Sequence, residues 1–463
     1  MFVDFCLKLW NGRVRPYALY PAVVATALQA RHRAADRDAI VARQSARVRA
    51  IVAHAARHVP YYRLIFSSMG LRADDIRAAE DLDQLPLLTR SDLQDLSHFL
   101  TADNVDTRLC EVWGTSGTTG RPIRVMRTLE ASVQMFARFE GRLPQMGISS
   151  SDFTPLGGNY VYISDTEYRP EYRRHSRRMP AFRLSCMEKF DIRPEFHATQ
   201  TSAIEGIHRL SPVLLQGKPS SMSRLVDYIE ELNTDRRFPI RPKAILTAAE
   251  QLTEQTRQKL KTAFHCDVFD SYNSTEAGMI GCECRYHDGL HFEDDDIVVE
   301  VITDGRRVDP GERGEIVVTD LTNRAMPMLR YRTGDIGSVS YEPCDCGRLY
   351  PRIMKIEGRI VDLFVTPKGE RFNPFVLLGD LPKLGLKQYQ LVQTSLHDVL
   401  VRYVGAAEPD VVIGAVRAGI TAKMGPDVRI AAERTGTLDV PGKKTRLYVN
   451  AIPVDAATGG DKS

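Results

Sequence analysis

The sequence predicts an α/β protein with a large N-terminal part and a small C-terminal lobe. Between about residues 109 and 340, short β-rich runs alternate with helical stretches, and this alternation is typical of α/β architecture. Residues 242–247 form one such run before a polar segment at 250–261, and residues 297–302 form another. Gly358 and Arg359 mark the expected boundary, so we expect an N-terminal domain at 1–358 and a small α/β lobe at 359–463.

Composition narrows the class of protein. The 463 residues are 43% hydrophobic, which is ample for folded cores, and the formal net charge is only +3. This balance gives no strong field for nucleic acid. No apolar run approaches the length of a membrane span, and the N-terminus lacks the pattern of a signal peptide. We therefore expect a cytoplasmic protein without a nucleic-acid partner.

Two helices can be placed in the first hundred residues. Residues 29–58 are rich in Ala, Arg and Val without Gly or Pro, and predict a helix that ends near Pro60. Residues 85–92 predict a loop that feeds a second helix. There Thr89 is the expected N-cap, and Asp92 follows three residues later.

Residues 114–120 read Gly-Thr-Ser-Gly-Thr-Thr-Gly, between an apolar stretch at 109–113 and an alternating stretch at 123–126. This pattern predicts a strand, a loop and a strand. Its glycines let the backbone N–H groups approach a ligand, and its hydroxyls can donate to phosphate oxygens. It is not a Walker A loop, because no Gly-Lys-Ser/Thr follows. A polar hairpin turn is the alternative.

Four of the eight cysteines form two Cys-x-Cys pairs about 60 residues apart. Cys282 and Cys284 are followed by His287 and His291, and the second pair lies in a Pro-Cys-Asp-Cys-Gly knuckle. Three thiolates and one imidazole would make a closed tetrahedral zinc site. Four unrelated reduced cysteines are the alternative. The second pair consists of Cys344 and Cys346.

Four further segments carry candidate binding groups. Residues 270–276 (Asp-Ser-Tyr-Asn-Ser-Thr-Glu) place a ring, hydroxyls and a carboxylate in one turn, which suits a purine, a phosphate and Mg²⁺. Residues 329–335 end in Thr-Gly-Asp, where a carboxylate suits ribose hydroxyls. Residues 358–362 contain Gly-Arg-Ile-Val-Asp, and residues 441–446 contain a Gly-flanked lysine that can reach a phosphate. A helix cap and a turn aspartate are the alternatives for the first two.

The order of these motifs resembles the adenylate-forming superfamily of acyl-CoA synthetases and adenylation domains. The likeness is greatest to the phenylacetate–CoA ligase branch, including its capsular-polysaccharide-associated relatives, and runs from about residue 45 to 447. The Val-Pro-Tyr-Tyr segment at 59–62, the Leu-Pro-Leu-Leu-Thr loop and the Cys-Asp-Cys-Gly-Arg segment also resemble that branch. The resemblance implies a large N-terminal domain with mixed sheets and flanking helices, plus a small mobile C-terminal lobe.

The resemblance also implies roles for individual residues. The phosphate loop would hold the ATP β- and γ-phosphates through Thr115, Ser116, Gly117, Thr118, Thr119 and Gly120. The adenine and acyl pocket would be lined by Ala248, Ala249 and Glu250, and the nucleotide turn consists of Tyr272, Asn273, Ser274, Thr275 and Glu276. Within that turn Tyr272 would stack on adenine, Thr275 would contact the α-phosphate and Glu276 would bind Mg²⁺.

Three residues would complete the site. Asp335 would bind the ribose with help from Arg359, and Lys443 would bridge the carboxylate and the α-phosphate. For zinc, alignment with the branch favours Cys284, His291, Cys344 and Cys346, with Cys282 and His287 as substitutes.

The chain departs from the family pattern at two positions. Asn273 stands where a glycine is usual, and Val361 stands where the hinge acid or lysine is usual, beside a retained Asp362. The swing of the C-terminal lobe is therefore less firmly implied than the adenylation site. Lys444 competes with Lys443, and only the Gly-Lys-x-x-Arg register decides between them.

The resemblance implies an AMP-forming ligase that activates an aryl or small organic acid with ATP and Mg²⁺ and passes the acyl group to coenzyme A. Transfer to an amine or a carrier protein is the first alternative. A non-catalytic nucleotide-binding scaffold is the second. The sequence does not name the acid, and a homodimer stays open as an oligomeric state.

Overall fold

The structure is a computed structural model of the 463-residue chain. It describes residues 36–114, 123–149, 152, 159–164, 177–178, 186–191, 197–232, 234, 237–359, 363–372, 374–386, 388–436, 438 and 448–452. The chain divides into two compact units, Met1–Thr333 with Ser338–Lys355, and Gly334–Gly337 with Ile356–Ser463. The boundary expected at residues 358 and 359 stays a prediction, near the change of unit between Lys355 and Ile356.

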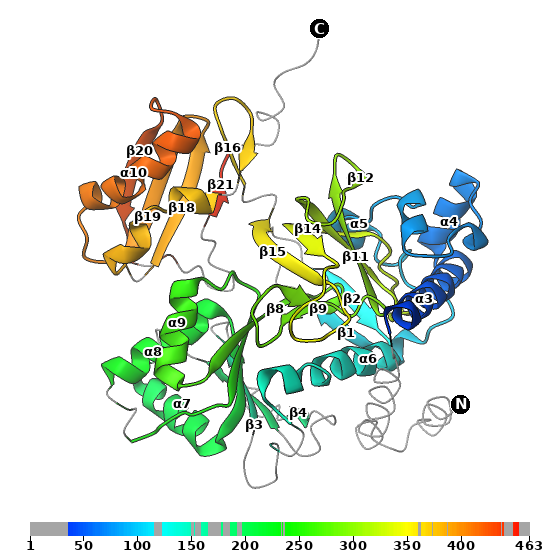
Figure 1. The fold of residues 1–463 in the computed structure, drawn as a ribbon, viewed down its shortest axis with the longest axis horizontal. Coiled ribbons are helices and arrows are strands. Elements are labelled where there is room, and N and C mark those ends of the chain that lie inside the picture. The colour runs from blue at the N-terminus through cyan, green and yellow to red at the C-terminus, as the bar shows by residue number, and fades with distance from the viewer. Residues whose placement is uncertain are drawn as a thin grey trace. The chain divides into compact units, whose positions relative to one another are not determined.

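The α-helices of the first unit are spread along its sequence (Figure 1). In the described part of that unit they are α3 (Arg37–His58), α4 (Pro60–Met69), α5 (Arg90–Asp95), α6 (Leu129–Glu140), α7 (His197–Leu210), α8 (Pro219–Glu231) and α9 (Glu254–Phe264).

The expected helix end and the expected N-cap are both found, but α3 begins at Arg37, after the extended N-cap residue Asp36, and not at residue 29. Helix α3 ends at His58, before Pro60, which is the first residue of α4 because proline needs no hydrogen-bond partner there. Residues 29–35 of the predicted helix lie outside the described residues. Helix α5 has the predicted N-cap: the Asp92 amide donates to Thr89 Oγ1 over 3.2 Å, and the Asp92 carboxylate accepts from the Thr89 amide over 2.7 Å.

A thirteen-stranded mixed sheet runs through the first unit, in the order β12-β11-β13-β14-β15-β10-β9-β8-β7-β6-β3-β5-β4. Its strands are β3 (Asn159–Ser164), β4 (Arg177–Arg178), β5 (Cys186–Asp191), β6 (Pro212–Gly217), β7 (Ala244–Ala248), β8 (Asp267–Ser274), β9 (Gly278–Glu283), β10 (Leu290–His291), β11 (Ile297–Thr303), β12 (Arg306–Arg307), β13 (Gly314–Asp320), β14 (Tyr331–Ser340) and β15 (Arg352–Arg359). Strands β5, β3, β6, β7 and β8 pair in parallel. The α/β class and the mixed sheet are confirmed.

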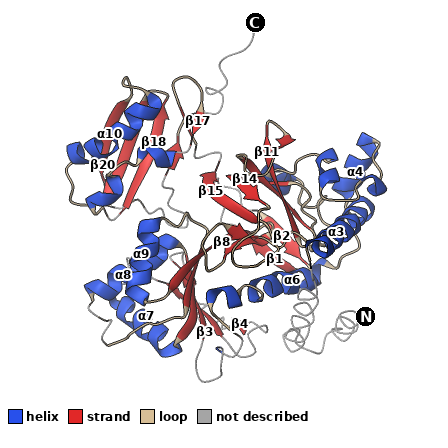
Figure 2. Ribbon diagram, viewed as in Figure 1, coloured by secondary structure: helices blue, strands red, loops and turns tan. Residues whose placement is uncertain are grey.

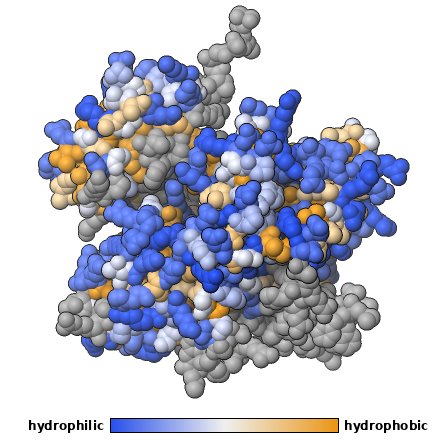
Figure 3. All heavy atoms as spheres, in the orientation of Figure 1, coloured by the Kyte–Doolittle hydropathy of each residue, from blue (hydrophilic) through white to orange (hydrophobic). Residues whose placement is uncertain are grey.

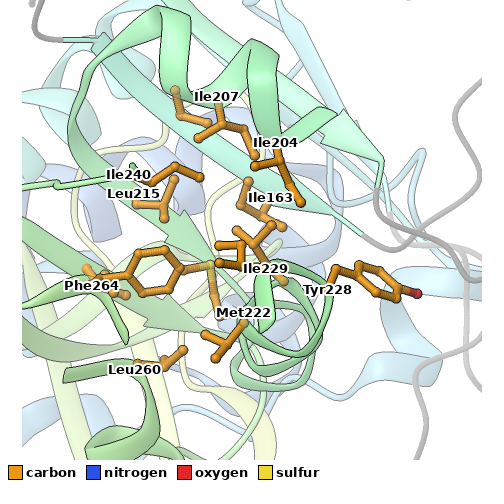
Figure 4. Close-up of a cluster of buried hydrophobic side chains, with 14 of the residues drawn as sticks. Ile163, Ile204, Ile207, Leu215, Met222, Tyr228, Ile229, Ile240, Leu260 and Phe264 are labelled. Atoms are coloured by element: carbon orange, nitrogen blue, oxygen red, sulfur yellow. The ribbon is translucent and has the colours of Figure 1, made fainter. Parts of the chain in front are cut away.

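Helices cover both faces of the parallel strands (Figure 2). Successive residues of a strand point to opposite faces. Leu215 and Ile245 therefore pack in a core with α7, α8 and α9. Figure 4 shows Leu215 in this core with Ile204, Met222 and Phe264. Their neighbours Leu214 and Leu246 pack with Phe139 of α6 in a second core. Since both faces are covered, β6 and β7 are buried along their whole length.

A two-stranded sheet made of β1 (Glu111–Gly114) and β2 (Arg124–Arg127) flanks the hydroxyl-rich loop. The strands pair antiparallel, with Gly114 opposite Arg124. The predicted strands on both sides of the loop are confirmed, although the first strand begins two residues later than expected. Residues Thr107–Leu109 instead form a 3₁₀ turn, which the Asp106 carboxylate caps. The loop itself, residues 115–122, lies outside the described residues.

Helix α3 is held on the first unit by ion pairs with a buried acidic run at residues 293–296. The pairs are Arg37–Asp294, Arg43–Asp295 and Arg47–Asp296. The fourth acid, Glu293, pairs with Arg142 and lies 3.7 Å from Arg348. Buried carboxylates need such partners, so this run connects α3 to the segment that directly follows β10.

The second unit is a small α/β fold with its own core. Its elements are β16 (Phe364–Val365), β17 (Arg371–Phe372), β18 (Gln388–Ser395), β19 (Asp398–Val404), α10 (Pro409–Met424), β20 (Arg429–Arg434) and β21 (Tyr448–Asn450). A four-stranded sheet of order β20-β19-β18-β21 packs Leu391 and Val401 against Val416 and Ile420 of α10. The expected C-terminal α/β lobe is therefore present.

The face shown in Figure 3 is mostly hydrophilic, with separate apolar patches, as is usual for a folded protein surface. None of the helices in the described part of the chain combines the length and apolar composition that crossing a membrane requires.

Candidate active site and metal centre

The candidate nucleotide turn lies where β8 leaves the sheet. Residues 275–277 form a tight turn between β8 and β9, which the Ala277 amide closes by donating to Ser274 Oγ over 2.9 Å. Gly278 has φ +74°, and a Cβ there would lie 2.6 Å from Met135 Sδ of α6. The left-handed backbone favours glycine there, and a larger residue would also have to displace the flexible Met135 side chain. This backbone conformation helps to set where Thr275 and Glu276 leave the end of β8.

The Glu276 side chain is almost fully buried, with 8% of its surface exposed, and groups from two residues lie close to its Oε1. Tyr331 Oη donates to Oε1 over 2.6 Å, and Arg90 Nη1 lies 3.5 Å from the same atom. Burial and the neighbouring carboxylate raise the pKa of Tyr331, so its hydroxyl remains a donor. The carboxylate is thus held in one orientation by groups from two other segments.

Arg127 links the turn to the strands around the hydroxyl-rich loop. Its Nη2 donates to the Glu276 carbonyl oxygen over 2.7 Å, and its Nη1 donates to Asp320 Oδ2 over 3.1 Å. The guanidinium also lies 5.5 Å from the ring centroid of Trp113 in β1, a favourable cation–π distance. Because Arg127 ends β2, both strands that flank the loop contact the Glu276 turn through one buried cation.

The predicted adenine and acyl segment lies beside the nucleotide turn. Ala248 ends β7 and pairs with Ser271 of β8, next to Tyr272, which is 8% exposed. Ala249 has φ +72°, an unfavourable backbone conformation for alanine. Glu250 Oε2 accepts a hydrogen bond from the Ser220 amide over 3.2 Å. The structure therefore brings 248–250 and Tyr272 together at the carboxyl ends of parallel strands, where ligands bind in open α/β sheets.

The other predicted site residues are placed only in part. Asp335 lies on β14, in the 334–337 segment that belongs to the second unit. Arg359 is the last residue of β15. Residues 115–120 and Lys443 lie outside the described residues, as does Val361 at the hinge position.

The four favoured zinc ligands lie together in the first unit. The sulfur atoms of Cys284, Cys344 and Cys346 and a ring nitrogen of His291 all lie within 4.8 Å of one another. Cys284 Sγ is 3.8 Å from Cys344 Sγ, and Cys346 Sγ is 3.3 Å from His291 Nε2. Tetrahedral bonds to zinc at the usual lengths place two sulfurs about 3.8 Å apart, and a sulfur and a nitrogen about 3.5 Å apart. The donor set therefore fits a four-coordinate zinc.

The surroundings of this cluster also suit a metal. His291 Nδ1 contacts the Tyr350 carbonyl oxygen over 2.9 Å, which places the proton there and leaves Nε2 facing the sulfurs. Burial lowers the pKa of His291 to about 4, so its ring is neutral and can ligate. Burial raises the pKa of Cys284 to about 12, so thiolates in this place require a bound cation.

The two substitute ligands lie elsewhere. Cys282 is buried in the core that contains Phe139 and Leu246. His287 Nδ1 contacts Glu283 Oε2 over 2.9 Å, and its Nε2 contacts Asp267 Oδ2 over 3.0 Å. Strand β9 ends at Glu283, so Cys284 lies beyond the strand and the period of two does not hold it on the face of Cys282. Both substitutes are engaged in other contacts.

The sequence argument missed Arg90, Arg127 and Tyr331. Arg90 and Tyr331 lie within segments that it singled out, at 85–92 and 329–335, but without a role. For Arg127 a signal was available: it follows Val125 at the strand period, so it shares the inward face with an apolar residue. A charged residue on that face requires a buried partner.

The chain is similar in sequence to several known proteins. No protein-family model matches the chain. Phenylacetate-coenzyme A ligase of Aromatoleum evansii is 27% identical over 340 residues, covering 72% of this chain and 73% of that protein. The ligase of the same name from Pseudomonas putida is 25% identical over 433 residues, covering 89% and 94%. Protein CapK of Staphylococcus aureus is 21% identical over 403 residues, covering 85% of each chain.

Among solved structures, 2-hydroxyisobutyryl-CoA ligase in the postadenylation state, in complex with 2-HIB-AMP, matches with a TM-score of 0.70. The match covers 91% of this chain and 90% of that chain at 20% identity, and so defines the fold. The chain has the fold of the adenylate-forming superfamily of acyl-CoA synthetases and adenylation domains. In sequence, the chain is similar to the phenylacetate-coenzyme A ligases, as the resemblance of its motifs predicts.

Proposed function

We propose that the protein is an AMP-forming carboxylate ligase that converts an organic acid, ATP and coenzyme A into an acyl-CoA. The observation that carries the proposal is the buried Glu276, which Arg127 connects to the strands flanking a hydroxyl-rich loop. A carboxylate that is fixed relative to the strands flanking such a loop suits a magnesium-bound nucleotide. The phenylacetate-coenzyme A ligases similar to this chain support the same chemistry.

The reaction has two steps. In the first, a carboxylate oxygen of the acid attacks the α-phosphorus of ATP, the bond to the β-phosphate breaks, and pyrophosphate leaves. In the second, the sulfur of coenzyme A attacks the acyl carbon, AMP leaves, and the thiol proton passes to solvent. Both partners in the first step are anions, so the protein must offset their repulsion and align them.

Individual residues are proposed for these tasks. Glu276 would hold Mg²⁺, whose charge stabilises the phosphates when it is bound. Thr275 would contact the α-phosphate, and Tyr272 would stack on adenine beside the 248–250 segment. Asp335 would bind the ribose with Arg359. The residues proposed to hold the departing pyrophosphate are Thr115, Ser116, Gly117, Thr118, Thr119 and Gly120.

The C-terminal lobe is proposed to supply the last group. Residues 359–463 would form this lobe and residues 1–358 the nucleotide-binding domain. Lys443 would bring a positive charge to the reacting carboxylate and α-phosphate. The lobe is proposed to move between the two steps, as the resemblance implies. Val361 stands at the hinge position, where an acid or a lysine is usual.

A structural zinc is proposed at Cys284, His291, Cys344 and Cys346. Four protein ligands leave no open position for water, so the ion would stabilise the fold and take no part in the reaction. It would fasten β10 to the 344–346 knuckle, close to the acidic run that holds α3.

The proposal also covers the acyl acceptor, the class of acid and the cellular location. We propose coenzyme A as the acyl acceptor in preference to an amine or a carrier protein, because similar proteins are named phenylacetate-coenzyme A ligases. An aryl or small organic acid is the proposed substrate class. The cytoplasm is the proposed location, since it supplies ATP and coenzyme A. A homodimer remains a prediction.

Acid-dependent exchange of pyrophosphate into ATP tests the proposal. Purified protein is assayed with a panel of aryl and short aliphatic acids, and product analysis with coenzyme A, amines or neither follows for each active acid. We expect exchange with at least one acid and a thioester with coenzyme A. Exchange followed by an amide would move the activity to an amide synthetase. No exchange with any acid, in protein that binds ATP, would favour a non-catalytic scaffold.

A further inference from the structure

Arg90, Glu276 and Tyr331 form one polar cluster from three separate segments. Both Arg90 Nη1, at 3.5 Å, and Tyr331 Oη, at 2.6 Å, meet Glu276 at Oε1. Arg90 also interacts with the Tyr331 side chain. The Glu276 carboxylate is 8% exposed and the Arg90 side chain 32%, so the pair is partly shielded from water. The proposed magnesium ligand therefore has a cationic partner within the protein itself.

The place of Arg90 is set by backbone contacts. The Leu88 amide donates to the Arg330 carbonyl oxygen over 2.9 Å, and the Arg332 amide donates to the Leu88 carbonyl oxygen over 2.9 Å. This parallel bridge fixes residue 88 beside Tyr331. Thr89 then caps α5, whose first residue is Arg90. Since the chain is held on both sides of Tyr331, the guanidinium is a built-in partner of Glu276.

A fixed cation at this carboxylate has a consequence for metal binding. Like charges repel strongly at short range where water is partly excluded. A bare divalent cation that approaches Glu276 meets the guanidinium of Arg90. A nucleotide brings several negative charges on its phosphates, which attract both cations and offset their repulsion.

We propose that Arg90 is a positioning residue, the counter-cation that occupies Glu276 until a metal–nucleotide complex arrives. The proposal rests on the proposed function, in which Glu276 is the metal ligand. Arg90 balances the buried charge and keeps Oε1 in place together with Tyr331. It also disfavours the metal alone, so that the divalent cation enters together with the nucleotide.

Binding of Mn²⁺ to the full chain, followed by the electron paramagnetic resonance signal of free Mn²⁺, tests this without an activity assay. Without nucleotide, Arg90→Gln is expected to bind Mn²⁺ about tenfold more tightly than the wild type, the low end of the effect of one neighbouring charge on proton binding. Arg90→Lys keeps the charge and should return the affinity to the wild-type value. With ATP present, the difference between Arg90→Gln and the wild type should shrink to about twofold, because the phosphates compensate for the cation.

Two controls test whether the gain in Mn²⁺ affinity comes from removing the charge of Arg90 beside Glu276. Arg63→Gln removes the same charge from an exposed pair with Asp103 and should leave Mn²⁺ affinity unchanged. Glu276→Gln in the Arg90→Gln background should abolish the added affinity. An Arg90→Gln affinity equal to or weaker than that of the wild type would overturn the proposal, as would a gain that survives Glu276→Gln.

The pyrophosphate-exchange assay distinguishes a failure of the Arg90 proposal from a failure of the proposed function. If the wild type exchanges pyrophosphate but Arg90→Gln leaves Mn²⁺ affinity unchanged, this inference alone fails. If no acid supports exchange in the wild type, the proposed function fails, whatever the Mn²⁺ result. Because Arg90 is partly exposed at the start of a helix, Arg90→Gln should fold, and circular dichroism with Arg90→Ala as a second variant checks this.

Discussion

Arg127 donates a hydrogen bond over 2.7 Å to the backbone carbonyl oxygen of Glu276, although 149 residues separate them. The same guanidinium pairs with Asp320, and both side chains are completely buried. The contact is with the backbone, so it sets the position of the turn and leaves the carboxylate of Glu276 free for other partners. One buried cation thus fixes the proposed metal ligand relative to the strands that flank the hydroxyl-rich loop.

We predict that Arg127→Met lowers the free energy of unfolding by about 3–5 kcal/mol, the cost of leaving a buried carboxylate without its partner. Equilibrium unfolding in urea measures this loss. Arg63→Met is the matched control, because its ion pair with Asp103 is exposed on both sides and should contribute less than about 1 kcal/mol. Equal losses in the two variants would show that the buried ion pair contributes no more to the free energy of unfolding than the exposed one.

The zinc proposal predicts about one zinc per chain by elemental analysis of purified protein. Cys344→Ser should lose the metal and lower the melting temperature by about 2 °C or more, the order of shift that about 1–2 kcal/mol produces in a large domain. Cys282→Ser is the matched control, since that thiol is equally buried but lies in an apolar core. It should retain zinc. Protein that contains no metal, or a Cys344→Ser variant that keeps it, contradicts the site.

These two cases show which parts of the fold and site could be predicted from the sequence. Local signals were sufficient for the Thr89–Asp92 cap, which spans four residues, and for the strands on either side of the hydroxyl-rich loop. The pairing of Arg127 with Asp320 joins residues 193 apart. No periodicity or spacing encodes such a contact, because it exists only once the sheet has brought distant strands together.

The residues of the candidate site were also predictable from the sequence only in part. Cysteine spacing indicated a zinc site, yet spacing alone left Cys282 and His287 as candidates. The side chain of His287 is turned instead toward Glu283 and Asp267, an ion-pair network that depends on where α9 and β8 lie. Arg90 was hidden for a similar reason: the parallel bridge between Leu88 and Tyr331 brings it to Glu276, and no local pattern predicts that bridge.

Asp270 predicts a pH dependence of stability. Burial, with some help from Glu283, raises its pKa from 3.8 to about 7. Between about pH 4 and pH 7 the folded state therefore keeps a proton that the unfolded state releases, so this carboxyl makes stability fall as pH rises through that window. Asp270→Asn retains the oxygen that accepts from Thr247 Oγ1, at 2.8 Å in the wild type, and removes the titration.

We expect the stability of Asp270→Asn relative to the wild type to rise from pH 4 to pH 7 and to stay level above pH 7, as measured by urea unfolding at each pH. Asp74→Asn removes a carboxyl that is 90% exposed, and its effect should stay within about 0.5 kcal/mol throughout. A constant difference between Asp270→Asn and the wild type across the window would contradict the raised pKa.

Lys443 gives the most direct test of the proposed chemistry. Lys443→Ala should lower acid-dependent pyrophosphate exchange by about 10²–10³-fold, the usual cost of losing one preorganised charge contact in a transition state. The melting temperature should hardly change, because the residue is proposed to act on the substrate and not on the fold. Lys444→Ala is the matched control, since the Gly-Lys-x-x-Arg register of residues 442–446 selects the first lysine. Full exchange in Lys443→Ala with a loss in Lys444→Ala would shift the role by one residue, and full exchange in both would remove this segment from the adenylation step.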